Sequence, residues 1–175
     1  MEETLHVHKT YDDLASEAKE VWAELKDKVL TQKERTKISI QDMPTLDPKK
    51  RASIMDEVAM GYTDEQARVE AQRCINCKNQ PCVKGCPVGI HIPEFIKEIQ
   101  DGNYKGAVDI IKLTNLLPAI CGRVCPQEKQ CQSVCTIGRM FKSPEKSVAI
   151  GRLERFVADW ERNNNKITIP SVAES

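Results

Sequence analysis

The eight cysteines are the residues of this sequence whose type and spacing best support chemistry. They fall in two groups, separated by a stretch without cysteine. The first group has the spacing C-x2-C-x4-C-x3-C-P, and the second has the spacing C-x3-C-x5-C-x3-C. In chain order the cysteines are Cys74, Cys77, Cys82, Cys86, Cys121, Cys125, Cys131 and Cys135. Closely spaced thiols of this kind bind metals, form disulfides or attach haem, and their spacing helps to separate these chemistries.

The spacing of the first group favours iron–sulfur clusters. It is close to the bacterial ferredoxin run C-x2-C-x2-C-x3-C-P, in which three cysteines hold one cluster and the fourth binds a second cluster. By this template Cys74, Cys77 and Cys82 bind one cluster, and Cys86 binds the other. Cys135 is the residue that we expect to return from the second group to complete the first cluster. Thiolate ligands are not preorganised in an unfolded chain, so such cofactors would be part of the fold.

Three other chemistries compete with iron–sulfur binding. Two structural zinc sites also use eight cysteines, usually as paired C-x2-4-C knuckles. Cys74 with Cys77 and Cys121 with Cys125 could serve as such knuckles, but only Cys74 with Cys77 has the tight C-x2-C spacing. Disulfides suit small secreted domains, whereas this sequence lacks an apolar signal segment and predicts long charged helices. Haem attachment requires C-x-x-C-H, and Lys78 stands where the histidine is needed.

The composition predicts one compact domain with an appended arm, because 175 residues can bury a core. Only 5% of the residues are aromatic and 30% are charged, so we expect metal clusters to fill part of the interior. The 26 Lys and Arg residues balance the 26 Asp and Glu residues, which argues against a nucleic-acid partner. No apolar run approaches the roughly 20 residues that span a membrane, and reduced cysteines indicate the cytoplasm.

Helix signals precede the first cysteine group. Thr10 and Asp13 resemble a capping box for an amphipathic helix of about 18 residues, and residues 31–46 are interpreted as a linker. The apolar positions of that helix are Leu14, Ala18, Val21, Leu25 and Val29. Asp47 and Pro48 then predict a helix that ends at Gly61. Another capping box, Thr63 with Gln66, predicts a helix that delivers Cys74.

A helical hairpin is predicted between the two cysteine groups. Its first helix begins at Pro93 and ends at Gly102, and its second helix runs from Tyr104 to Leu113. The first cysteine group lies in a loop rich in turn residues, whose backbone N–H groups we expect to point at sulfur. Residues 136–146, after the last cysteine, also predict a loop.

The last clear helix is predicted over residues 147–162, and its apolar stripe contains one acidic residue. Glu154 lies between Ile150 and Val157 on that stripe, which points its carboxylate toward the buried face. A buried carboxylate needs a partner, and a metal would satisfy it. The periodicity itself favours the alternative, an exposed Glu154 that pairs with an arginine or a lysine. Gly151, one turn earlier, would leave room for a bulky cluster.

Three blocks of the sequence carry a family resemblance: EVAMGYTDEQARVEAQRCINCKNQPCVKGCPVGIHIPEFI, LPAICGRVCPQEKQCQSVC and SVAIGRLERF. On these blocks residues 47–163 resemble the N-terminal iron–sulfur domain of the glutamate synthase small subunit and of dihydropyrimidine dehydrogenase. The resemblance implies an all-α fold, an alpha-helical ferredoxin with two [4Fe-4S] clusters bound in loops between helices. Residues 1–46 would then form an N-terminal helix and linker, and residues 164–175 a C-terminal tail or linker.

The resemblance also implies the ligands of both clusters. One cluster would be held by Cys74, Cys77, Cys82 and Cys135. The other would be held by Cys86, Cys125, Cys131 and Glu154, which stands where dihydropyrimidine dehydrogenase has a glutamine. Cys121 would then lie near a cluster without binding iron, whereas spacing alone puts it on the iron. An anionic oxygen ligand favours the oxidised cluster, so a low potential is expected for the second centre.

The resemblance finally implies a function in electron transfer. Larger family members continue into a flavin domain that opens with G-x-G-x-x-G, a pattern that the eight glycines here never form. FAD and NAD(P)H are therefore expected on a downstream domain or a partner. The chain would be the electron-transfer part of an NAD(P)H-dependent flavoprotein oxidoreductase resembling the glutamate synthase small subunit, without turnover of its own.

The expected partners are a flavoprotein domain or subunit and a catalytic large subunit or ferredoxin. The alternative function is a non-redox interaction module. In that case zinc or iron–sulfur centres would only stabilise the fold, and the first helix would recruit a partner subunit.

Overall fold

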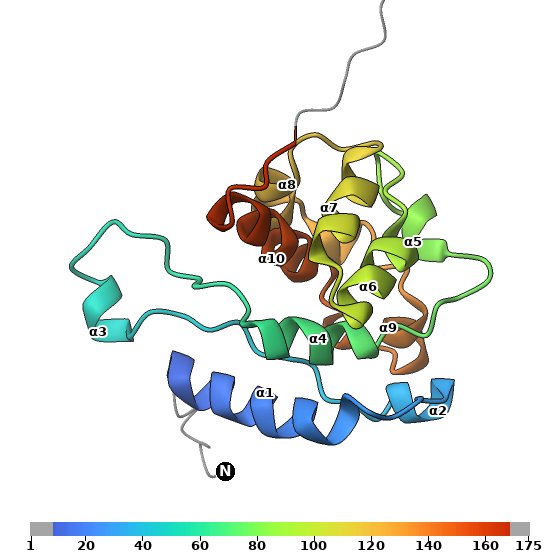
Figure 1. The fold of residues 1–175 in the computed structure, drawn as a ribbon, viewed down its shortest axis with the longest axis horizontal. Helices are drawn as coiled ribbons and strands as arrows, with labels where there is room; N and C mark the ends of the chain where they lie inside the picture. Colours follow the sequence, from blue (N-terminus) through green and yellow to red (C-terminus); the bar gives the residue numbers. More distant parts are fainter. Residues whose placement is uncertain (1–8, 169–175) are drawn as a thin grey trace, which may run out of the picture.

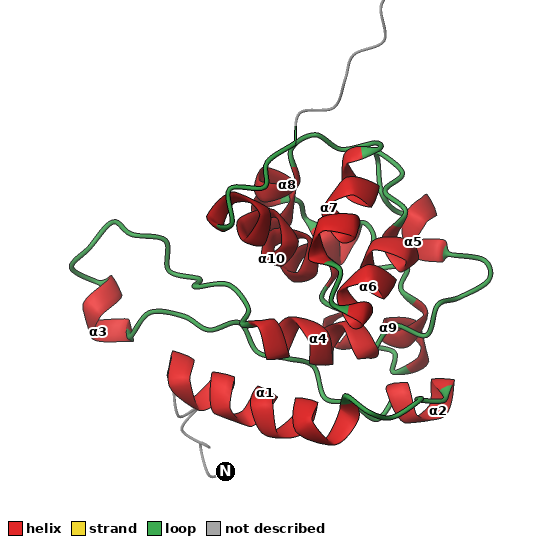
Figure 2. Cartoon of the chain, in the orientation of Figure 1, coloured by secondary structure: helices red, strands yellow, loops and turns green. Residues whose placement is uncertain are grey.

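Helices form the regular secondary structure of the chain (Figure 1 and Figure 2). The computed structural model describes residues 9–168, and within that range the only β-type pairing is an isolated bridge between Thr45 and Ala59. The all-α class expected from the sequence is therefore confirmed. In chain order the helices are α1 (Tyr11–Leu25), α2 (Gln32–Arg35), α3 (Pro48–Arg51), α4 (Asp64–Gln72), α5 (Pro81–Lys84), α6 (Ile92–Asp101), α7 (Tyr104–Lys112), α8 (Pro118–Val124), the 3-10 helix η1 (Gln127–Lys129), α9 (Thr136–Met140), the 3-10 helix η2 (Pro144–Lys146) and α10 (Ile150–Asn163).

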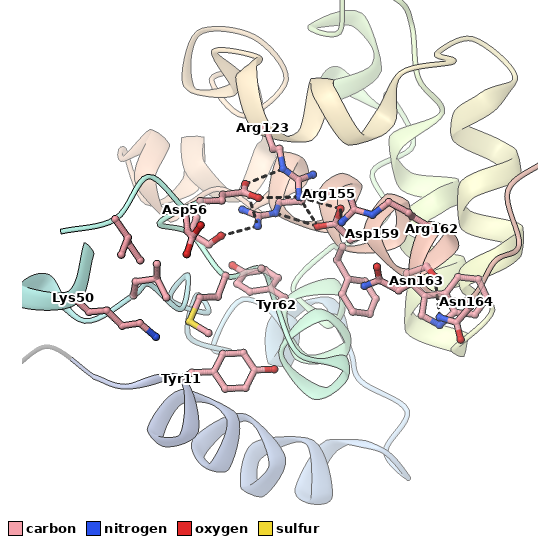
Figure 3. A pocket seen from close by; sticks show the side chains of 18 residues that line it. Tyr11, Lys50, Asp56, Tyr62, Arg123, Arg155, Asp159, Arg162, Asn163 and Asn164 are labelled. Carbon is pink, nitrogen blue, oxygen red and sulfur yellow. Dashed lines mark hydrogen bonds and ion pairs between the residues drawn. The ribbon is translucent and has the colours of Figure 1, made fainter. Parts of the chain in front are cut away.

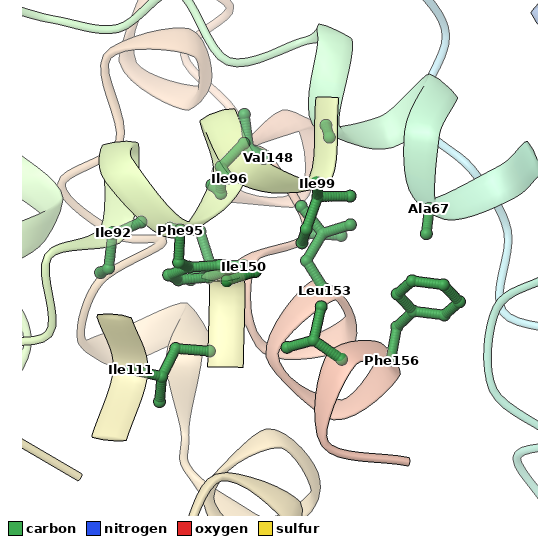
Figure 4. Packing of buried hydrophobic residues seen from close by; sticks show 14 of the residues in the cluster. Ala67, Ile92, Phe95, Ile96, Ile99, Ile111, Val148, Ile150, Leu153 and Phe156 are labelled. Atoms are coloured by element: carbon green, nitrogen blue, oxygen red, sulfur yellow. The ribbon is translucent and has the colours of Figure 1, made fainter. Parts of the chain in front are cut away.

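Helices α4, α6, α7 and α10 pack together as the body of the fold, and α8 lies against α10. Their facing sides carry fully buried apolar side chains, including Phe95 and Ile99 of α6, Ile111 of α7 and Leu153 of α10 (Figure 4). This packing explains why the predicted hairpin of α6 and α7 is found as expected. Among residues 9–168, no helix is long and apolar enough to cross a lipid bilayer.

Local signals in the sequence define several helix ends. The capping boxes at the starts of α1 and α4 are both present, as predicted, with Thr10 and Thr63 as the capping residues. Helix α6 ends at Gly102, whose φ of 78° lies in the left-handed region that glycine adopts without steric cost. These ends depend on contacts within a few residues, which is why the sequence reveals them.

Helix α1 packs its apolar face on α4 (Figure 1). Leu14 and Ala18 are buried in this contact. The helix is 15 residues long and ends at Leu25, so its predicted extension to Val29 is wrong. Val29 is fully exposed, because the charged residues 26–28 that precede it offer no apolar face to bury.

Residues 45–61 form an extended arm instead of the helix predicted to end at Gly61. Asp47 caps a helix start as expected, but α3 ends after 4 residues at Arg51. Two backbone hydrogen bonds, of 2.8 and 2.9 Å, join the two ends of the arm around the Thr45–Ala59 bridge. This pairing between distant residues overrides the local helix signal. Figure 1 shows the arm, with α3 at its far end, projecting from the body.

Several short helices occupy segments where the sequence predicted none, including α2 in the predicted linker 31–46 and α5 in the predicted loop of the first cysteine group. Residues 136–146, predicted as a loop, contain α9 and η2. The second cysteine group begins on α8, which starts with Pro118 at its first turn. Helices of five to seven residues are too short for hydrophobic periodicity to reveal them.

A buried ion pair joins α4 to segments distant in sequence. Glu70, in the last turn of α4, pairs with Arg73, which directly follows the helix, and both are almost completely buried. The Glu70 carboxylate also accepts hydrogen bonds from the backbone N–H groups of Gln41 (2.8 Å) and Ala149 (2.9 Å). Arg73 donates to the backbone carbonyl of Ser147 (2.9 Å). Burial raises the pKa of Glu70, and Arg73 opposes this shift. The pair therefore holds residues 147–149, which lead into α10, against the end of α4.

We predict that Arg73→Met destabilises the cofactor-loaded protein by about 3–5 kcal/mol, because it leaves the Glu70 carboxylate buried without its cation. For a chain of this size, that loss lowers the thermal midpoint by about 6–20 °C. The control is Lys97→Met, which breaks the exposed pair with Asp101 and costs about 0.5 kcal/mol or less. Circular dichroism during anaerobic heating measures both. Equal midpoints for the two variants would contradict the prediction.

Candidate metal centres

Four cysteines from distant parts of the chain line one cavity, here called the first cavity. Cys74 and Cys77 lie in the loop after α4, Cys82 lies on α5, and Cys135 directly precedes α9. The structure thus brings together the four residues that spacing and resemblance assign to one cluster. The remaining lining residues are Ile75, Pro81, Ile92, Pro93, Ile96, Thr136, Ile137, Val148 and Ile150.

Backbone N–H groups point at the sulfur atoms of the first cavity, as predicted. The N–H of Asn76 donates to the sulfur of Cys74, and the N–H of Val83 donates to the sulfur of Cys82. Asn76 has a φ of 48°, a left-handed conformation that asparagine tolerates better than most residues. The loop conformation therefore supplies hydrogen-bond donors of the kind that tune cluster potentials.

The second cavity is lined by the other four cysteines and by Glu154. Cys121 lies on α8 and Cys125 at its end, while Glu154 projects from α10. The structure therefore brings together all the residues that the resemblance assigns to the second cluster, together with Cys121. The remaining lining residues are Pro87, Val88, Ile90, Ile92, Phe95, Asn115, Gln127, Gln130 and Ile150.

The two cavities are neighbours that share a wall. Ile92, at the start of α6, and Ile150, at the start of α10, line both of them. Both side chains are almost completely buried. Apolar side chains, rather than water-filled space, therefore separate the two groups of thiols.

A close crossing of α8 and α10 positions the second cavity. A Cβ atom on Gly122 of α8 would lie 2.6 Å from the backbone nitrogen and 2.8 Å from the Cα of Arg155 on α10. Only glycine permits this approach, since backbone atoms cannot move aside as a flexible side chain can. The crossing brings Cys121 and Cys125 beside Glu154.

Gly151 has a different role from the one expected. Its missing side chain does not make room for a cluster, because a Cβ there would lie 2.1 Å from Nε2 of Gln127. The space is filled by the Gln127 side chain, which also donates to the backbone carbonyl of Cys121 (3.2 Å). Gly151 therefore lets the Gln127 side chain pack against α10 and line the second cavity.

Glu154 is buried, so the alternative of an exposed, ion-paired residue is wrong. Only 5% of its surface is exposed, and among residues 9–168 it forms no ion pair. Its Oε1 accepts a hydrogen bond of 2.8 Å from Nδ2 of Asn115. Arg152 and Arg155, the nearest arginines in sequence, donate instead to the backbone carbonyls of Gln41 and Ala59.

Burial makes the acidic groups of both cavities harder to ionise. It raises the pKa of Cys74 to about 11 and that of Cys82 to about 12 in the first cavity. In the second cavity it raises the pKa of Cys125 to about 11 and that of Cys131 to about 12. It also raises the pKa of Glu154 to about 7, against the hydrogen bond from Asn115. A bound metal reverses this preference, because it favours thiolate and carboxylate ligands.

The donor atoms of each cavity do not converge on a single point. Among residues 9–168, no three His, Cys, Asp or Glu side chains converge closely enough to hold a single metal ion. The cavities themselves are narrow, with volumes of about 20 Å³ for the first and about 90 Å³ for the second. Sulfur donors that line an apolar cavity without converging on one point fit a multi-iron cluster better than a single metal ion.

A third cavity contains no cysteine and lies between the arm and α10 (Figure 3). Figure 3 shows Arg123, Arg155 and Asp159 converging on its wall. Arg123 of α8 pairs with Asp159 of α10 at 2.8 Å, and Arg155 donates to the backbone carbonyl of Ala59 in the arm at 2.7 Å. These contacts reinforce the crossing of α8 and α10 and anchor the arm to it.

Sequence reasoning missed two residues of the second cavity, Asn115 and Gln127. Asn115 stands in the largely apolar run LTNLLPAIC, where an isolated amide is a detectable but nonspecific signal. Gln127 gives no local signal, because its role depends on Gly151, which is distant in sequence.

His91, which directly precedes α6, lies at the surface and contacts Glu94 at 3.2 Å.

The helical fold and the thiol-lined cavities define a protein of the iron–sulfur class. The profile of the family described as dihydropyrimidine dehydrogenase domain II, 4Fe-4S cluster, matches residues 50–166. The chain belongs to this family, as the resemblance implied.

The chain is similar to several curated proteins, among them a dihydropyrimidine dehydrogenase subunit and two glutamate synthase small chains. The chain is 42% identical over 108 residues to the NAD-dependent dihydropyrimidine dehydrogenase subunit PreT of Escherichia coli K12, and the match covers 62% of this chain and 25% of PreT. It is 33% identical over 138 residues to the glutamate synthase [NADPH] small chain of Halomonas elongata, and the match covers 73% of this chain and 28% of that relative. It is 35% identical over 123 residues to the glutamate synthase [NADPH] small chain of E. coli K12, and the match covers 67% of this chain and 25% of that relative. The chain thus spans about a quarter of the length of these relatives.

Proposed function

We propose that the chain is an electron-transfer domain or subunit of a larger oxidoreductase and holds two [4Fe-4S] clusters, one in each cysteine-lined cavity. The observation that carries the proposal is that cysteines of both sequence groups meet in each cavity. The ligands in the first cavity would be Cys74, Cys77, Cys82 and Cys135. The ligands in the second cavity would be Cys86, Cys125, Cys131 and Glu154. The matched span of 50–166 supports residues 47–163 as the cluster-binding unit.

Clusters bound in this way would accept and donate single electrons. The residues of the chain would control that exchange. Apolar side chains limit the access of water to the thiolates, and the N–H groups of Asn76 and Val83 stabilise negative charge on sulfur. Ile92 and Ile150 would keep the two centres adjacent but separate.

An NAD(P)H-oxidising flavoprotein is the proposed source of electrons. The names of the relatives refer to NAD and NADPH, and the chain covers only about a quarter of each relative. We place FAD and NAD(P)H on a downstream domain or a separate subunit. In addition to this flavoprotein, a catalytic large subunit or ferredoxin would exchange electrons with the chain. Free thiols in all eight cysteines suit a cytoplasmic location.

An exposed apolar surface beside the second cavity supports exchange with a protein partner. Five large apolar side chains, each more than half exposed, cluster in sequence around its lining residues. They are Leu113, Leu116, Leu117, Ile120 and Val124. Leu116 directly follows Asn115, Ile120 directly precedes Cys121, and Val124 directly precedes Cys125. Clustered apolar surface of this kind marks interaction sites.

We predict that the purified protein is brown and contains about eight iron atoms and as many acid-labile sulfides per chain. Dithionite should bleach its visible colour, because the centres accept electrons. Iron, zinc and sulfide analysis of anaerobically purified protein measures this directly. Colourless protein that contains zinc would instead support the non-redox interaction module.

We predict that Glu154→Gln raises the midpoint potential of one centre, because it removes a negative charge from the oxidised and reduced forms alike and so favours gaining an electron. A shift of about 59 mV or more is expected, which is a tenfold change in a one-electron equilibrium. Potentiometric titration followed by electron paramagnetic resonance measures it. Glu128→Gln, which removes an exposed charge, is the control and should leave both potentials nearly unchanged. An unchanged potential in Glu154→Gln would refute Glu154 as a ligand.

We predict that Ile120→Lys weakens binding to the flavoprotein partner by about tenfold or more, because the interface would have to bury a charge. The iron content should stay the same, since the Ile120 side chain is 53% exposed. Met55→Lys is the matched control, because Met55 is fully exposed on the arm. Stopped-flow reduction of the protein at varied partner concentration measures the effect. Equal rates for the two variants would exclude this surface as the contact.

A further inference from the structure

We propose that Asn115 selects the fourth ligand of the second cluster by holding Glu154 toward the cavity and Cys121 away from the iron. The inference rests on the proposed function, in which this cavity binds a cluster. Asn115 is only 6% exposed and lines the cavity between the other two side chains. It is a positioning residue, because it acts through the groups that it contacts.

The hydrogen bonds of Asn115 fix the orientation of its side-chain amide. The backbone N–H of Leu117 can only donate, so the atom that it contacts at 3.0 Å must be Oδ1. Nδ2 then faces Oε1 of Glu154 at 2.8 Å. A reversed amide would set donor against donor at Leu117 and acceptor against acceptor at Glu154.

The same amide oxygen engages Cys121. Its Sγ lies 3.6 Å from Oδ1 of Asn115, within reach of a hydrogen bond from sulfur. Cysteine binds iron as a thiolate, which has no proton to donate. If Cys121 bound iron, its thiolate would face Oδ1 of Asn115, which can only accept a hydrogen bond. Cys77 differs, because the hydroxyl that it contacts, that of Thr136, can donate to a thiolate. The contact with Asn115 therefore disfavours Cys121 as a ligand.

Glu154 keeps one carboxylate oxygen that could bind iron. Asn115 donates a hydrogen bond to Oε1, whereas Oε2 has no hydrogen-bond partner among the described residues. Every fully buried side-chain nitrogen or oxygen in residues 9–168 has a partner, so Oε2 must reach open space. Because Glu154 lines the second cavity, we infer that Oε2 faces this cavity.

Cys121 lies close enough to compete for the same position. Its side chain contacts that of Cys125, which we assign to the cluster. Iron–sulfur clusters are bound far more often by thiolate than by carboxylate. Without the contact to Asn115, Cys121 would therefore displace Glu154.

The test combines alkylation of the cluster-loaded full chain with electron paramagnetic resonance. Iodoacetamide labelling followed by mass spectrometry should modify Cys121 in the wild-type protein and leave the seven ligand cysteines protected. In Asn115→Leu, a substitution of similar size, labelling of Cys121 should fall to the level of the other cysteines. The signal of the second centre should change at the same time. Asn115→Ala provides a second variant in case the leucine disturbs folding.

A double variant tests whether the change arises from Cys121 itself. Asn115→Leu combined with Cys121→Ser removes the competing thiol, so the wild-type signal should return. Cys121→Ser alone should keep its full iron content and its signal. A loaded Asn115 variant with wild-type signal and reactive Cys121 would overturn the role of Asn115 and leave the clusters intact. Protection of Cys121 in the wild-type protein would overturn Glu154 as a ligand, and the inference with it.

Discussion

The close crossing of α8 and α10 is the contact on which the second cavity depends. It requires glycine at Gly122, because the backbone of Arg155 fills the space of a side chain. The ion pair between Arg123 and Asp159 spans the same two helices. Since α8 carries two cysteines and α10 carries Glu154, this one contact sets the distance between donors that are about thirty residues apart in sequence.

The first cavity depends on a different constraint. Its cysteines lie in loops and at helix ends, so no single helix crossing positions all four. Two contacts orient those loops: backbone N–H groups that point at sulfur, and the buried pair of Glu70 with Arg73. Arg73 holds the segment that leads into α10, where Ile150 separates the two cavities. The two cavities are therefore coupled through the start of α10.

The sequence predicted those features that depend on neighbouring residues. The capping boxes at Thr10 and Thr63 and the glycine stop at Gly102 require only local contacts, and all are present. The helix predicted to end at Gly61 does not form, because the two ends of the arm pair with each other at Thr45 and Ala59. No local sequence pattern reveals such a pairing. Spacing also assigned Cys74, Cys77, Cys82 and Cys135 to one site, and these four side chains line one cavity.

Glu154 marks the limit of such reasoning. Its position on the stripe of α10 was visible, but periodicity could not decide between a buried and an exposed carboxylate. The decisive information lies in Asn115, whose contact with Glu154 joins residues 39 positions apart.

The two cavities differ in a way that would affect electron flow through the two proposed clusters. The first offers four thiols, whereas the second offers three thiols, a carboxylate and one additional thiol held by an amide. Clusters with different ligand charge and hydrogen bonding have different potentials. Two adjacent centres of unequal potential give a direction to electron transfer that two identical centres would lack. The asymmetry around Glu154 would therefore determine how the pair of centres works as a unit.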